Sequence, residues 1–126
     1  MHMHMRRLLS LVLIVPLTLL LTACPNLASS ARDTSAALQG LIVAAQAKYQ
    51  STCTATPSQA VCVDINKAVS GENALVTATE AYCNWSTTSP PTDTTVPCVP
   101  VQSAAAGLQT AISNANTLIN EIKGTL

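Results

Sequence analysis

The chain has very few aromatic and charged residues. Its 126 residues include no Phe, one Trp and two Tyr, and only 10% of them are charged. The two histidines, His2 and His4, both lie within the first four residues, so the rest of the chain has no imidazole to serve as a general base. No Ser occurs in a motif with a neighbouring base, and no basic patch marks a nucleic-acid surface. The sequence therefore argues against an enzyme and against a nucleic-acid-binding protein.

The start of the chain has the pattern of an export signal. Arg6 and Arg7 precede residues 8–21, a stretch without charge. A stretch of this length is shorter than the roughly 20 residues that a transmembrane helix needs. It does suit the apolar region of a secretory signal, which ends before small residues and a cleavage site.

The tetrapeptide Leu21-Thr22-Ala23-Cys24 resembles the lipobox of bacterial lipoproteins. The resemblance implies cleavage between Ala23 and Cys24, diacylglycerol on the Cys24 thiol and an acyl chain on the new amino group. We therefore expect a signal peptide at 1–23 and a membrane anchor at Cys24. The protein would belong to the cell envelope, on the outer side of the cytoplasmic membrane or in the outer membrane. No other cofactor is expected.

Five cysteines are an odd number for an exported protein. If Cys24 carries lipid, Cys53, Cys62, Cys83 and Cys98 remain, and in an oxidising compartment four thiols predict two disulfides. A zinc site made of these four residues is the alternative. Their spacing contains no C-x-x-C pair, so no metal is expected.

After a short lipidated tether at 24–31, the pattern predicts one all-α domain at 32–126. Apolar residues recur at spacings of three and four, which indicates amphipathic helices at about 32–52, 57–85 and 100–124. The third helix is the most regular of the three. Its expected core positions are Val101, Ala105, Leu108, Ile112, Ala115, Ile119, Ile122 and Leu126.

The second helix has a clear start and a weak centre. Thr56-Pro57-Ser58-Gln59 has the order of a capping box, with Pro at the first helical position. At the centre, Gly71 costs about 1 kcal/mol relative to Ala, and Glu72 falls at a position that the period assigns to the core. One continuous helix is favoured because the apolar face resumes in phase, and a break at Gly71 is the alternative. Glu72 and Glu80 are expected to be solvated.

Three helices joined by two loops predict a disulfide-stapled, up-down-up three-helix bundle. A continuous second helix would separate Cys62 from Cys83 by about 31 Å, whereas bridged Cα atoms lie within roughly 7 Å. The expected disulfides are therefore Cys53–Cys62 and Cys83–Cys98. Should the helix fold back at Gly71, Cys62–Cys83 becomes the alternative pair.

The 86–100 segment is rich in Pro, Ser and Thr and predicts a solvated connector, with a partner site or glycosylation as alternatives. Trp85 lies just before it, at the bundle end that the tether would turn toward the membrane. Trp85 is thus a candidate membrane-interface contact. Packing of its indole on the bundle end is the alternative. Gly40 and Gly107 are expected to mark a close helix crossing.

The leading functional expectation is a structural or protein-interaction module anchored in the envelope by lipid. Its partner would be an envelope protein or a second copy of the chain. The alternative is an accessory lipoprotein that binds a small molecule between its helices. An apolar pocket larger than about 300 Å³ inside the bundle would favour binding. A solid core with an exposed apolar stripe would favour assembly.

Overall fold

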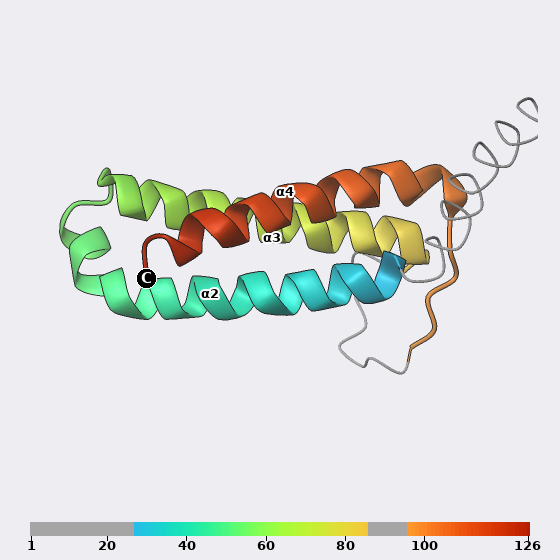
Figure 1. Cartoon of the computed structure of the whole chain (residues 1–126), viewed down its shortest axis with the longest axis horizontal. Helices are drawn as coiled ribbons and strands as arrows, with labels where there is room; N and C mark the ends of the chain where they lie inside the picture. The colour runs from blue at the N-terminus through green and yellow to red at the C-terminus, as the bar shows by residue number, and fades with distance from the viewer. Residues whose placement is uncertain (1–26, 86–95) are drawn as a thin grey trace, which may run out of the picture.

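Three long helices lie side by side in the computed structural model, which describes residues 27–85 and 96–126. They are α2 (Leu27–Ala55), α3 (Ala60–Cys83) and α4 (Ala105–Lys123), the last preceded by a single 3-10 turn, η2 (Gln102–Ala104). Figure 1 shows that α2 and α4 run in the same direction along the bundle and α3 runs in the opposite direction. Each helix packs against the other two. The predicted all-α, up-down-up bundle is confirmed. The expected signal peptide and Cys24 lie outside the described residues.

Helix α2 begins earlier than predicted. It starts at Leu27, so residues 27–31 belong to the helix and not to the predicted tether. Leu27 and Ala31 are four residues apart, and both are buried in the core. Burial of this extra turn outweighs the weak local preference of Ser29 and Ser30 for loops. The helix also extends three residues beyond Thr52, to Ala55.

The start of α3 also differs from the prediction. Thr56 accepts a hydrogen bond from the Gln59 N–H at 3.1 Å, which makes these residues a turn. The helix begins only at Ala60, and Gln59 is an N-cap without a side-chain cap bond. The predicted capping box is therefore wrong, and Pro57 belongs to the turn. The four residues 56–59 must reverse the chain direction between two antiparallel helices, which leaves none of them for the first helical turn.

Helix α3 continues through Gly71, as the in-phase apolar face predicted. Gly71 is also a point of close contact between α3 and α4. A Cβ atom added there would overlap the Leu118 side chain of α4. At Gly40 and Gly107 an added Cβ would meet nothing within 4 Å, so the close crossing expected of that pair is wrong.

The core follows the predicted helix faces. Of the positions expected in α4, Leu108, Ala115 and Ile122 are almost fully buried, whereas Leu126 is 44% exposed beyond the helix end. Leu118 is buried although it flanks this seam, because Gly71 leaves room for it. The largest fully buried side chains are Tyr82, Leu38, Leu75, Leu108 and Ile122.

The last residues of the chain return to α2, as Figure 1 shows. The Tyr49 hydroxyl donates a hydrogen bond to the Thr125 carbonyl oxygen at 2.5 Å. The Lys48 ammonium donates to the Leu126 oxygen at 2.8 Å. These bonds tie α4 to α2 at the end of the bundle opposite Trp85.

Candidate functional site

Both predicted disulfides are present, one at each end of the bundle. The Cα atoms of Cys53 and Cys62 are 5.5 Å apart, and those of Cys83 and Cys98 are 4.4 Å apart. The alternative Cys62–Cys83 pair does not form, because the continuous α3 holds these residues at its two ends. All four described cysteines are thus bonded and none is a free nucleophile.

The Cys83–Cys98 end is closed by main-chain hydrogen bonds as well. Asn84 adopts the left-handed conformation (φ 55°), and the Trp85 N–H bonds the Glu80 carbonyl at 2.9 Å. The returning chain supplies two more donors. The N–H of Val101 bonds the Tyr82 carbonyl at 2.7 Å, and that of Val99 bonds the Cys83 carbonyl at 3.3 Å. The last carbonyls of a helix have no partner within it, and here the returning chain serves as that partner.

Trp85 packs on this closed end and is only partly exposed. Its indole Nε1–H donates to the Pro97 carbonyl at 3.1 Å. The guanidinium carbon of Arg32 lies 5.0 Å from the indole ring centroid, within cation–π range. Arg32 also donates to the Val96 carbonyl at 3.4 Å. The structure therefore shows the packing alternative for Trp85, while a contact with a bilayer stays a prediction.

Glu72 and Ser35 form a polar contact in the middle of the α2–α3 interface. The Ser35 hydroxyl donates to Glu72 Oε1. The other carboxylate oxygen, Oε2, is buried without a hydrogen-bond partner in the described structure. Burial raises the pKa of Glu72 above its ordinary value of 4.5, and the hydrogen bond from Ser35 opposes that rise. Burial dominates because removing a carboxylate from water disfavours its charged form.

The expectation that both glutamates are solvated is wrong. Glu80 is only 6% exposed, and Glu72 is half-buried at the core position that the helical period gave it. The period was thus the signal that located Glu72. The sequence could not identify the hydrogen-bond partner of Glu72 in the same way, because nothing in it distinguishes Ser35 from the other small polar residues of α2.

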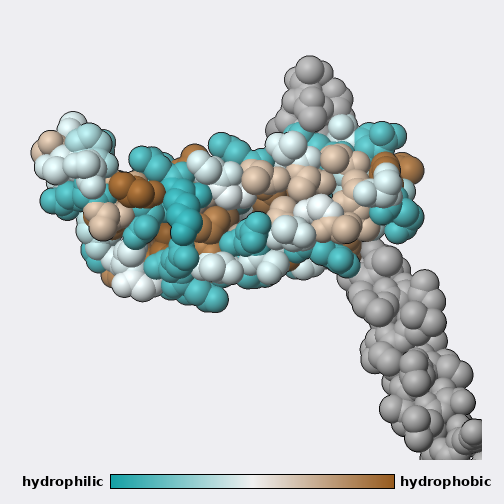
Figure 2. Space-filling view, turned by 90° about the horizontal axis from the view of Figure 1, so that it is seen from above, coloured by the Kyte–Doolittle hydropathy of each residue, from teal (hydrophilic) through white to brown (hydrophobic). Residues whose placement is uncertain are grey.

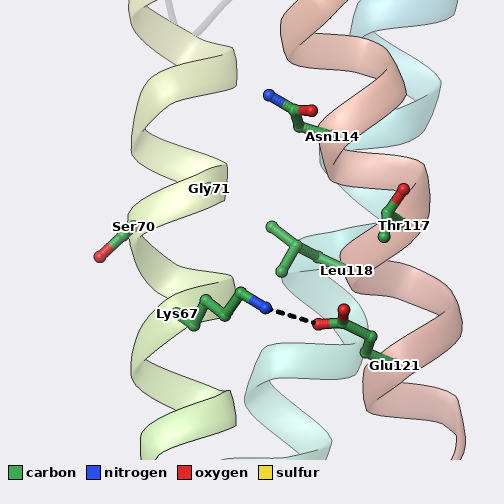
Figure 3. A pocket seen from close by; sticks show the side chains of 7 residues that line it. All are labelled: Lys67, Ser70, Gly71, Asn114, Thr117, Leu118 and Glu121. Carbon is green, nitrogen blue, oxygen red and sulfur yellow. Dashed lines mark hydrogen bonds and ion pairs between the residues drawn. The ribbon is translucent and has the colours of Figure 1, made fainter.

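Two surface grooves of the bundle are lined by described residues. The larger, of about 390 Å³, runs between α3 and α4. Figure 3 shows the Leu118 side chain pointing from α4 towards Gly71 on α3. The Lys67–Glu121 ion pair, with an N–O distance of 3.2 Å, crosses one end of the groove. Its remaining lining residues are Ser70, Asn114 and Thr117.

The second groove, of about 320 Å³, lies beside the Cys53–Cys62 bridge. Uncharged polar side chains make up half of its lining, which consists of Gln46, Gln50, Cys53, Thr54, Pro57, Cys62, Ile65 and Asn66. Neither groove is the apolar pocket inside the bundle that was expected of a small-molecule binder.

Large apolar side chains on the surface are scattered. The exposed ones in the described residues are Val43, Val63, Val76, Val99 and Leu126, which come from α2, α3, the segment before η2 and the chain end. On the face seen in Figure 2, hydrophilic residues lie between the hydrophobic ones. The described large apolar residues therefore do not form the exposed apolar stripe that would favour assembly.

Neither a metal-binding cluster nor a membrane-spanning helix is found in the described part of the chain. No group of three or more His, Cys, Asp or Glu residues in residues 27–85 and 96–126 is placed to hold a metal ion. Within the same ranges, no helix has the length and hydropathy to cross a membrane. Comparison of the chain with protein-family models, with curated proteins and with solved structures finds no match.

Proposed function

We propose that this protein is a lipid-anchored structural or protein-interaction module of the cell envelope. The observation that carries the proposal is the use of the five cysteines. Four of them pair in two disulfides, which are typical of an oxidising, extracytoplasmic compartment. The fifth, Cys24, is the residue that the lipobox pattern assigns to lipid.

The anchor would hold the bundle close to the bilayer. Because α2 begins at Leu27, only three residue steps separate it from Cys24, a reach of at most about 10 Å. The start of α2 lies at the same end as Trp85, since Arg32 stacks on the indole. This end would therefore face the membrane, and the Cys53–Cys62 end would point away from it.

An interaction role suits the chemistry of the domain. Its four described thiols are oxidised, and its surface carries few charges and many Ser, Thr, Asn and Gln side chains. Such a surface suits contact with another envelope protein or with a second copy of the chain. Crosslinking in intact cells, followed by mass spectrometry, would identify the partner, and recovery of uncrosslinked monomer alone would count against this role.

Small-molecule binding is the second candidate, and the α3–α4 groove is the observation that favours it. The groove has an apolar floor at Leu118 and hydrogen-bonding groups around it from Ser70, Asn114 and Thr117. A ligand there would be polar and uncharged, since Lys67 and Glu121 already neutralise each other.

Lipid labelling tests the anchor directly. Cells that express the chain would be fed a radiolabelled or clickable fatty acid, with Cys24→Ala as the test variant. We expect label and membrane sedimentation for the wild type and loss of both for Cys24→Ala, because the thiol is the site of diacylglycerol attachment.

The double variant Cys53→Ala/Cys62→Ala is the matched control for removal of cysteine and should keep its label. A wild-type chain without label, or a Cys24→Ala chain that still carries it, would overturn the proposed anchor.

A further inference from the structure

Glu72 is the one ionisable side chain in the middle of the bundle. Among residues 34–47 of α2, 68–79 of α3 and 105–120 of α4, Glu72 is the only Asp, Glu, Lys, Arg, His, Cys or Tyr. It does not point away into solvent. It lies at the α2–α3 interface, with one carboxylate oxygen bonded to Ser35 and the other buried and unpaired.

The other charged groups along the packed helices are at the ends or already engaged. On α2 the nearest are Asp33, which is exposed, and Arg32, which stacks on the indole and bonds a main-chain carbonyl. On α4 the nearest is Glu121, which pairs with Lys67 of α3. On α3 itself the next carboxylate is Glu80, eight residues further along. Arg32 of α2 and Lys67 of α3 thus have partners other than the Glu72 carboxylate.

Ser35 uses its hydroxyl differently from five other Ser and Thr residues of the helices. The hydroxyls of Thr54, Ser70, Thr79, Thr110 and Thr117 each donate to the main-chain carbonyl four residues earlier in their own helix. Ser35 instead donates across the interface to Glu72. The α2–α3 contact thus contains a hydrogen bond whose acceptor can gain or lose a proton.

We propose that Ser35 and Glu72 form a pH-sensitive latch that holds α2 against α3 more firmly in acidic than in neutral solution. When the carboxylate is ionised, a negative oxygen is buried without a donor, which favours local opening of the interface and access of water. When it takes a proton from solvent, that charge disappears. The neutral acid can donate to Ser35 Oγ, and Ser35 can then donate to the carbonyl of Ala31, one turn back.

The direction of the pH effect follows from the raised pKa. The closed bundle binds the Glu72 proton more tightly than the open or unfolded chain, in which the carboxyl group titrates near its ordinary value of 4.5. Stability therefore falls as pH rises from that value through the folded pKa and levels off above it. The latch tightens as the solution is acidified across this window. It concerns the bundle alone and does not depend on the lipid anchor.

Hydrogen exchange of the full-length chain in detergent tests the latch. Protection factors, corrected for the intrinsic exchange rate, would be measured for α2 and α3 at about pH 5 and about pH 7.5. For each pH unit within the window, the opening equilibrium should change by up to about tenfold. In Glu72→Gln, which is neutral at both pH values, this component of the difference should vanish. Glu121→Gln is the matched control: it removes an exposed carboxylate of the same kind and should keep the wild-type difference.

A second measurement covers the case in which Glu72→Gln fails to fold. The side-chain carboxyl carbon of Glu72 would be followed by NMR during a pH titration of the wild type and of Ser35→Ala. We expect Glu72 to titrate above 4.5, and higher still in Ser35→Ala, because the hydrogen bond from Ser35 favours the ionised form. Titration of Glu72 at or below 4.5 would overturn the latch, as would an unchanged pH difference in a folded Glu72→Gln.

Discussion

The ends and the middle of this bundle are held together in different ways. Each end has a disulfide, and the Cys83–Cys98 end adds main-chain bonds from Val99 and Val101 and the stacking of Arg32 on Trp85. The middle has no covalent tie. It relies on the packing of alanine, leucine and isoleucine, the fit of Leu118 over Gly71 and the polar contact of Ser35 with Glu72.

The difference follows from the composition. A core without Phe buries little area for each residue, and a small domain of this kind gains much of its net stability from cross-links. Cross-links at both ends leave the middle able to tolerate a buried carboxylate. Loss of a cross-link should therefore cost more stability than a change in packing, whether that change lies in the middle or at an end.

Removal of the disulfides should have the largest effect. The Cys83–Cys98 bridge spans 15 residues and the Cys53–Cys62 bridge spans 9. In the chain-entropy model these loops contribute about 3 and about 2.6 kcal/mol. We expect the Cys→Ala double variants to lose stability in that order, measured by urea unfolding of the oxidised wild type and of each variant. Equal stability of all three proteins would contradict the contrast between ends and middle.

Gly71→Ala should have the next largest effect. The new methyl group would overlap the Leu118 side chain, and overpacking of this kind costs about 1–3 kcal/mol. Better helix propensity offsets about 1 kcal/mol of that cost. The net result should be a lower thermal midpoint. The midpoint would stay unchanged only if the Leu118 side chain rotates away from the new methyl group.

Gly40→Ala is the matched control for this change, because it is helical, exposed and has open space at the Cβ position. It should stabilise the bundle by about 0.5–1 kcal/mol. If Gly71→Ala and Gly40→Ala raise the thermal midpoint equally, the burial of Leu118 does not require a glycine at position 71.

Trp85→Phe should have the smallest effect of the three. An aromatic ring remains for Arg32, but the Nε1–H bond to the Pro97 carbonyl is lost. One hydrogen bond contributes about 1 kcal/mol. We expect a loss of that size in urea unfolding, and Trp85→Ala should lose more because it also removes the ring. A Trp85→Phe variant as destabilised as Trp85→Ala would show that the ring contributes nothing.

The sequence predicted those features that depend on the period of the apolar residues and on the number and spacing of the cysteines. The apolar period located the three helix faces and placed Glu72 on a core position. The length of a continuous α3 then selected the two disulfides from the three pairings that four cysteines allow. These predictions hold because each depends on backbone geometry that every helix shares.

Other features depend on contacts between distant residues, and the sequence alone could not give them. The buried Leu27 extends α2 through residues that favour loops, and the turn at 56–59 overrides a capping pattern. Gly71 was read as a cost because Leu118, its neighbour in space, is 47 positions away in the sequence. Gly40 and Gly107 were paired by their distance along the helices, although a Cβ atom added at either would meet nothing within 4 Å.

The two disulfides have a consequence for the timing of folding. On the proposed export route, the chain would cross the membrane from a reducing compartment in which neither bridge forms. There the bundle would lack about 5–6 kcal/mol of loop-closure stabilisation, a large share of what a small domain has in total. The same bonds that hold the two ends would thus keep the newly made chain loose enough to be transported, and lock it only after arrival.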